Sequence, residues 1–129
     1  MSDQIKHECG IALIRLLKPL KFYQKKYGSS SYGANKMYLM MEKQHNRGQD
    51  GAGLATVKMD AKPGEKYIFR ERSSAKQPIQ EVFTRVNERM ASSNEKNGNV
   101  PFQAELLLGH VRYGTFGKNN LESVHPFLR

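Results

Sequence analysis

The chain of 129 residues contains a single cysteine, Cys9, and no tryptophan. One cysteine excludes an intrachain disulfide framework, which favours a reducing compartment. No apolar run approaches the ~20 residues of a membrane span, and the polar opening MSDQIKHE lacks the apolar core of a secretory signal. We therefore expect a cytoplasmic protein without a membrane partner.

Acidic residues are also scarce, and none lies between Cys9 and Met41. The chain has 21 lysines and arginines against 12 aspartates and glutamates, a formal net charge of +9. A basic segment of this kind attracts phosphates, nucleic acid or an acidic protein face, although most charge runs form solvated surface. Its aromatic residues lack the period of a base-stacking sheet, so we expect no nucleic-acid partner.

The first part of the chain predicts a strand followed by a helix. Residues 9–17 form an apolar run that Lys18-Pro19 ends, which indicates a buried strand. Residues 21–33 are expected to form a loop or a short irregular helix. Asn35 is expected to cap a helix that ends near Gln44.

The remainder predicts a hairpin, a helix and a last strand. The stretch 45–53 (HNRGQDGAG) holds three glycines and is not expected to form a regular element. The sequence KPGE at 62–65 favours a turn. The other expected elements are strands over 54–59, 67–70 and 104–111 and a helix over 78–90, whose apolar face is Ile79, Val82, Phe83, Val86 and Met90. Together these elements indicate an α+β fold for a single domain or part of one.

Three stretches carry residues suited to chemistry: CGIALI, QHNRGQDGAG and GHVRYGTFG. Each stretch alone is weak evidence for a function. As an ordered set, they resemble the glutamine amidotransferases of the N-terminal-cysteine type (class II). That group belongs to the N-terminal nucleophile hydrolases. Asp50 in RGQD and Tyr113 after Arg112 place the resemblance nearest to the amidophosphoribosyltransferases. The motifs extend from Cys9 to Phe127, nearly the whole chain.

The resemblance implies an α/β/β/α sandwich of the N-terminal nucleophile hydrolase type, incomplete in this chain. Residues 1–8 would be a leader that is removed, and residues 9–129 the first part of the amidotransferase domain. The family's oxyanion-hole Asn-Gly motif follows the Arg-Tyr motif, so Asn97-Gly98 lies in the wrong order to replace it. A phosphoribosyltransferase domain would belong to the full-length protein.

Cys9 is the candidate catalytic nucleophile. An amino-terminal cysteine carries its own base, because its α-amine has a pKa of about 7.7 to 8.0 and is partly free near neutral pH. The resemblance implies that the sulfur attacks the side-chain amide of glutamine, releases ammonia and leaves a thioester that water hydrolyses. The alternative is an inert cysteine in a buried strand.

Four further residues are candidates for binding L-glutamine. The guanidinium of Arg112 suits a bidentate pair with the α-carboxylate, although it is also a plausible surface ion-pair partner. The resemblance implies that Thr115, Arg47 and Gly48 line the same pocket. His45 and His110 are expected to be structural, and His7 with Cys9 offers too few ligands for a metal.

The implied function is that of the full-length protein, and this part alone is expected to be inactive. Ammonia from glutamine would react with phosphoribosyl pyrophosphate to give 5-phosphoribosylamine, the first step of purine synthesis. We expect a homo-oligomer, no cofactor in this part, and Mg²⁺ only in the phosphoribosyltransferase domain. Asn46, between His45 and Arg47, and the basic insertion 18–32 depart from the family pattern. They leave open a basic non-catalytic binding module, or the glutaminase domain of another class II amidotransferase.

Overall fold

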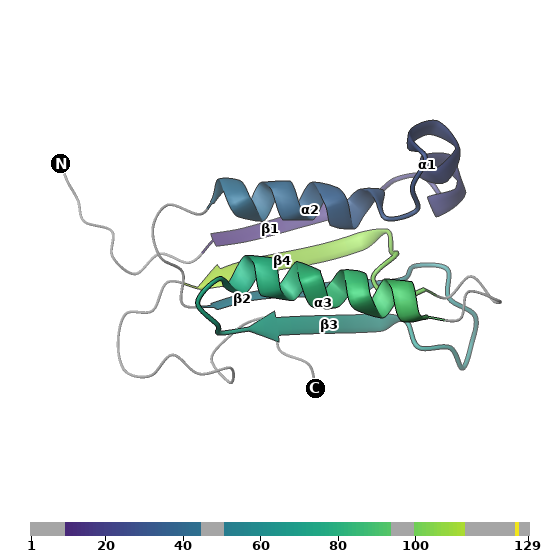
Figure 1. The fold of residues 1–129 in the computed structure, drawn as a ribbon. Coiled ribbons are helices and arrows are strands. Elements are labelled where there is room, and N and C mark those ends of the chain that lie inside the picture. Colours follow the sequence, from purple (N-terminus) through teal and green to yellow (C-terminus); the bar gives the residue numbers. More distant parts are fainter. Residues whose placement is uncertain (1–9, 45–50, 94–99, 113–125, 127–129) are drawn as a thin grey trace.

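The computed structural model describes residues 10–44, 51–93, 100–112 and 126. Over these residues the chain has an α+β fold, with a four-stranded antiparallel sheet and three helices (Figure 1). The elements in chain order are β1 (Gly10–Arg15), α1 (Leu20–Tyr27), α2 (Tyr32–Lys43), β2 (Gly51–Val57), β3 (Ile68–Ser73), α3 (Pro78–Ser92) and β4 (Leu106–Arg112).

The strands lie in the order β1-β4-β2-β3, so the first and last strands of the described residues are neighbours. β4 is antiparallel to both β1 and β2, and its Val111 pairs with Gly10 on one side and Ala52 on the other. β2 and β3 form the expected hairpin. Its loop contains the expected turn, in which the Glu65 amide donates to the Lys62 carbonyl at 3.0 Å and Gly64 has a φ of 87°.

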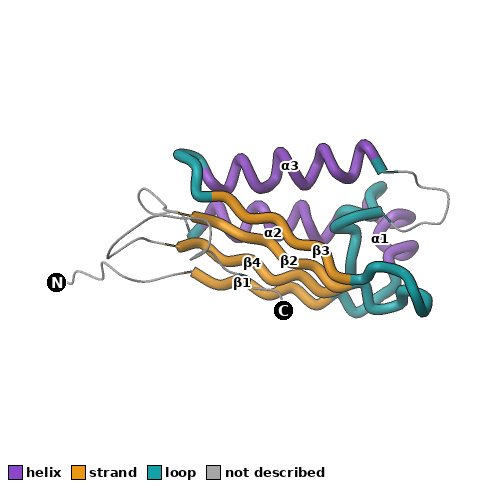
Figure 2. The backbone as a smooth tube through the Cα atoms, turned by 90° about the horizontal axis from the view of Figure 1, so that it is seen from below, coloured by secondary structure: helices purple, strands orange, loops and turns teal. Residues whose placement is uncertain are grey.

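Helices α2 and α3 cover one face of the sheet (Figure 2). Alternate strand residues point toward them, and the core between the layers includes Ala12, Leu54, Phe69, Leu107 and Val111. α2 contributes the fully buried Met37 and Met41, whereas Met40 is exposed. α3 contributes Ile79, Val82, Phe83 and Val86, which confirms the apolar face that helical spacing predicts.

The opposite face of the sheet has no helix over it among the described residues (Figure 2). Ile11 is 67% exposed and Leu13 is 61% exposed, although both belong to an apolar strand. Arg70, also on this face, donates to the carbonyl of the buried Pro126 at 3.3 Å. The alternation of side chains therefore leaves an apolar strip on this face, where a sheet that packs a layer on only one face would normally carry polar residues.

Of two expectations for the first helical region, the short helix was confirmed in part and the helix cap was wrong. Residues 20–27 form a regular helix, α1, because Tyr23 is buried and stacks on Tyr27 and Tyr32. Gly28 ends this helix in the left-handed conformation, with a φ of 80°. Asn35 is not a cap: it lies inside α2, whose N-cap is Ser31, with no side-chain capping hydrogen bond.

The glycine-rich stretch also differs from expectation, because Gly51 and Gly53 belong to strand β2 rather than to an irregular segment. β2 lies between β3 and β4 and is bonded along both edges. Glycine weakens a strand by about 0.5–1 kcal/mol relative to alanine, which this double pairing offsets. Smaller differences occur at element ends, since β2 ends at Val57 and α3 continues to Ser92.

Gly109 is a position where an added side chain would crowd the buried methionines of α2. A Cβ there would lie 2.6 Å from the Met37 sulfur and 2.9 Å from the Met41 sulfur. Gly109→Val should therefore lower the free energy of unfolding by about 1–2 kcal/mol, because overpacking of about 1–3 kcal/mol exceeds the gain in strand propensity. Urea unfolding measures this loss of stability. Leu108→Val, on the open face of the same strand, should change stability by less than about 0.5 kcal/mol; equal losses would contradict the packing argument.

Candidate functional site

One end of the sheet brings together residues from all three sequence motifs. β1 begins there at Gly10, β2 begins there at Gly51, and β4 ends there at Arg112. The register fixes this arrangement, since Gly10 pairs with Val111 and Gly51 pairs with Arg112. Segments that are far apart in the sequence thus meet on three adjacent strands (Figure 1). We refer to this end as the motif end.

Arg112 is the predicted site residue that the structure describes. It is the last residue of β4, it is half-buried, and its Cα partner is Gly51. Cys9, Arg47, Gly48 and Thr115 lie outside the described residues. In the sequence, Cys9 immediately precedes β1, and Arg47 and Gly48 precede β2 by only a few residues. Thr115 follows Arg112 by three positions.

Gln44 holds the start of β1 in place, a role that the sequence interpretation missed. Its side-chain amide nitrogen donates to the Ile11 carbonyl at 3.3 Å. A Cβ added to Gly10 would meet the side-chain amide of Gln44, which would have to shift. Gln44 opens the QHNRGQDGAG stretch, and only the fold shows that it contacts CGIALI.

His110 lies next to this end and is buried, with 4% of its surface exposed. Its Cα partners are Ile11 in β1 and Gly53 in β2. A buried position in the middle of the sheet suits the structural role expected of it. His45 and Asp50 lie outside the described residues.

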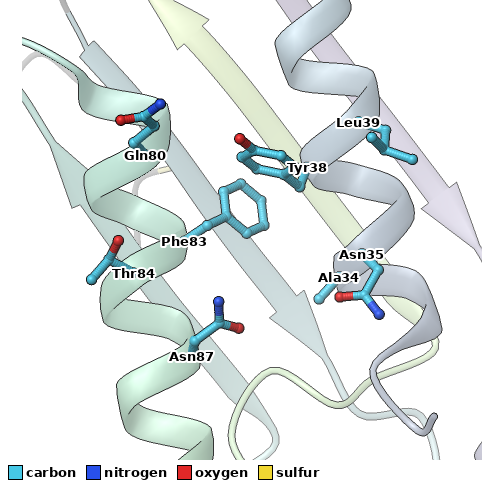
Figure 3. Close-up of a pocket in the computed structure, with 8 residues that line it drawn as sticks. All are labelled: Ala34, Asn35, Tyr38, Leu39, Gln80, Phe83, Thr84 and Asn87. Atoms are coloured by element: carbon cyan, nitrogen blue, oxygen red, sulfur yellow. The ribbon is translucent and has the colours of Figure 1, made fainter.

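A hollow lies elsewhere, between α2 and α3 (Figure 3). It encloses about 510 Å³, and the rings of Tyr38 and Phe83 meet at its centre edge to face, with centroids 5.2 Å apart. Asn35 and Asn87 stand at its border. A second cavity lies at the end of the sheet away from the motif end. Neither cavity includes Gly10 or Arg112.

The part of the chain that the structure describes contains no cluster of three or more His, Cys, Asp or Glu side chains suited to a metal ion. Within the same residues, no helix combines the length and apolar character needed to cross a bilayer.

Comparison with known proteins gives a partial similarity to an amidophosphoribosyltransferase. No family model matches the chain. Amidophosphoribosyltransferase 2, chloroplastic, from Arabidopsis thaliana is 28% identical to it over 127 residues. The alignment covers 98% of this chain but only 17% of that protein, so the chain spans about a sixth of the length of the relative. The similarity suggests a distant, partial relationship to the amidotransferases.

Proposed function

We propose that this chain is the nucleophile-bearing part of a class II glutamine amidotransferase. In the complete protein, ammonia from L-glutamine would react with phosphoribosyl pyrophosphate to give 5-phosphoribosylamine. The observation that carries the proposal is the register of β1, β4 and β2, which places the borders of the three motifs at one end of the sheet. The name of the distant relative supports the same reaction.

Cys9 would act as the nucleophile once residues 1–8 are removed. Its thiol proton passes to the α-amine, and the sulfur attacks the carbonyl carbon of the glutamine side-chain amide. The amine then protonates the departing ammonia, which leaves a γ-glutamyl thioester. A water molecule attacks the thioester, releases glutamate and restores the thiol. In the sequence, Cys9 immediately precedes β1, and β1 pairs with β4 from Gly10 and Val111 onward. This pairing would give the nucleophile a rigid support.

Arg112 would bind the α-carboxylate of glutamine from the neighbouring strand. It ends β4, the direct partner of β1, and its guanidinium can form two parallel hydrogen bonds with a carboxylate. Thr115, Arg47 and Gly48 would line the same pocket from the segments that follow β4 and precede β2. No cofactor enters this reaction.

The remaining parts of the proposal concern the complete protein. A second sheet would pack on the exposed face that carries Ile11 and Leu13, which would complete the α/β/β/α sandwich of an N-terminal nucleophile hydrolase. The phosphoribosyltransferase domain would bind phosphoribosyl pyrophosphate with Mg²⁺. We further propose a cytoplasmic homo-oligomer, with residues 9–129 as the first part of the amidotransferase domain.

The decisive experiment treats the complete protein, purified after expression in cells, with a diazo-ketone analogue of glutamine. Mass spectrometry of the intact chain and its peptides should show loss of residues 1–8 and one label on Cys9. Glutamate release should stop in proportion to labelling. An unprocessed chain that takes up no label would favour the alternative of a basic binding module without catalytic activity.

Arg112→Lys tests the carboxylate contact. The change keeps the charge but removes the planar fork, and should cost on the order of 1.5–3 kcal/mol in kcat/KM for glutamine, about 10- to 150-fold. Arg85→Lys is the matched control, since Arg85 lies on α3 in surface ion pairs with Glu71 and Glu81. Steady-state glutamate release measures both variants. Normal glutamine kinetics in Arg112→Lys would refute the assigned role.

A further inference from the structure

Two charged residues are buried side by side at the end of the sheet opposite the motif end. Val57 of β2 pairs with Leu106 of β4, so the next residues outward, Lys58 and Glu105, lie opposite one another. Lys58 is 8% exposed and Glu105 is 6% exposed. By strand alternation both point to the face that Leu54 shares, the face covered by helices. This pair is separate from the site proposed for glutamine.

The pair lines a cavity of about 710 Å³, a size that accommodates a small organic molecule. One wall is the start of α1, with Lys21 and Gln24, and the other is the loop after β2, with Asp60 and Lys62. Gln103 adds a second amide to the lining. The basic insertion 18–32 therefore forms part of a cavity rather than only a solvated surface.

Two carboxylates of this cavity, Glu65 and Glu105, already accept hydrogen bonds, whereas the Lys58 ammonium has no close partner among the described residues. An oxygen of Glu105 accepts from the Met59 amide at 3.0 Å, and an oxygen of Glu65 accepts from the Lys62 amide at 3.0 Å. Within the described residues, no hydrogen bond and no ion pair of 4.0 Å or less involves the Lys58 ammonium. Partial desolvation of this ammonium is unfavourable unless something pairs with it.

The electrostatics of Lys58 agree with this geometry. Burial lowers the pKa of its ammonium from the ordinary value of 10.5, and the negative charges of Glu105, Asp60 and Glu65 oppose that lowering. The carboxylates favour the charged form of Lys58 without contacting it. An anion entering the cavity would supply the missing contact.

We propose that this cavity binds a small organic anion, and that a carboxylate or phosphate oxygen of the ligand accepts a hydrogen bond from the Lys58 ammonium. Lys21 and Lys62 would add positive charge, and the amides of Gln24 and Gln103 would bind the polar remainder of the ligand. Three lysines and three carboxylates, Asp60, Glu65 and Glu105, line the cavity. This balance favours a ligand of one or two negative charges over a polyanion.

The test is thermal unfolding of the 129-residue chain with inorganic phosphate or with succinate, against sodium chloride at equal ionic strength. At a concentration 100-fold above Kd, the favoured anion should raise Tm by roughly 5 to 10 °C, and the rise should saturate. The arm with the larger rise identifies a phosphate or a carboxylate as the preferred group. No specific rise with either anion would overturn the proposal.

Lys58→Met should abolish the rise while leaving Tm without ligand unchanged or higher, because it removes a charge that burial of the side chain disfavours. Lys25→Met makes the same charge change on α1 outside the cavity lining and should retain the rise. An undiminished rise in Lys58→Met would refute the site.

Glu105→Gln provides a second test. The change keeps an acceptor for the Met59 amide and removes a competing negative charge, so the affinity for the anion should increase about 3- to 10-fold. Weaker or unchanged binding in that variant would contradict the proposal even if Lys58→Met failed to fold.

Discussion

Replacing Cys9 by alanine should reduce glutamine hydrolysis by the complete, processed protein about 10⁴- to 10⁶-fold, the usual effect of removing a catalytic nucleophile. No other side chain in the chain is a thiol, so no residue can substitute for the lost sulfur. Cys9→Ser should restore little activity, because a hydroxyl is a much weaker nucleophile than a thiol near neutral pH. Glutamate release under saturating glutamine measures both variants.

A matched control separates loss of the nucleophile from loss of the fold. If ammonia is the species transferred, then added ammonium should restore product formation in Cys9→Ala, since the defect lies before the transfer step. The diazo-ketone analogue should no longer label the protein. Labelling that persists in Cys9→Ala would show that the nucleophile is another residue.

Phe102→Ala should lower the free energy of unfolding by about 3–5 kcal/mol, the typical cost of removing a buried phenylalanine ring. Phe102 is fully buried, and its ring centroid lies 5.8 Å from that of Phe69. The guanidinium of Arg89 lies 4.8 Å from the same ring, and it also binds Glu71 at 3.1 Å. The variant would leave a cavity and remove a face on which the Arg89 cation packs.

The backbone of Phe102 supplies the comparison variant, because its φ is 67°, in the left-handed region. Phe102→Gly should be more stable than Phe102→Ala by about 1 kcal/mol, since glycine adopts this conformation without the cost of a Cβ. Leu17→Ala, at a position 83% exposed, should lose less than about 0.5 kcal/mol. Urea unfolding measures all three. A smaller loss in Phe102→Ala than in Leu17→Ala would contradict the packing argument.

Local patterns were sufficient to predict a helix over residues 78–90, which α3 extends to Ser92, and the hairpin of β2 and β3. In α3, proline stands in the first turn and apolar residues recur at helical spacing, so the prediction needs nothing beyond the segment itself. The hairpin follows from the turn residues between two apolar runs. In both cases the interacting residues are close in the sequence.

Features that depend on distant contacts were missed or wrong. Gly51 to Gly53 become strand because β3 and β4 bond to both edges, and nothing in the glycine-rich stretch itself indicates this. Stacking of Tyr23 on Tyr32 stabilises α1 from outside the helix. The two proposed sites show the same division. The motifs predicted a role for Arg112 from the sequence alone, whereas a lone lysine such as Lys58 gives no pattern, because the cavity that it lines is built from segments distant in the sequence.

The pairing of β1 with β4 constrains the order in which the protein can form. Residue 10 has its sheet partner at residue 111, so this edge of the sheet closes a loop of about a hundred residues, and such long-range pairing slows folding. The hairpin of β2 and β3 can pair, with α3 packed on it, while the chain is still on the ribosome. Among the described strands, β1 has no partner until β4 emerges, which at about 5–20 residues per second takes roughly 5 to 20 s after β1 itself. The proposed nucleophile therefore gains its rigid support only near the end of synthesis of this segment, so the chemistry of the amino terminus is coupled to completion of the sheet.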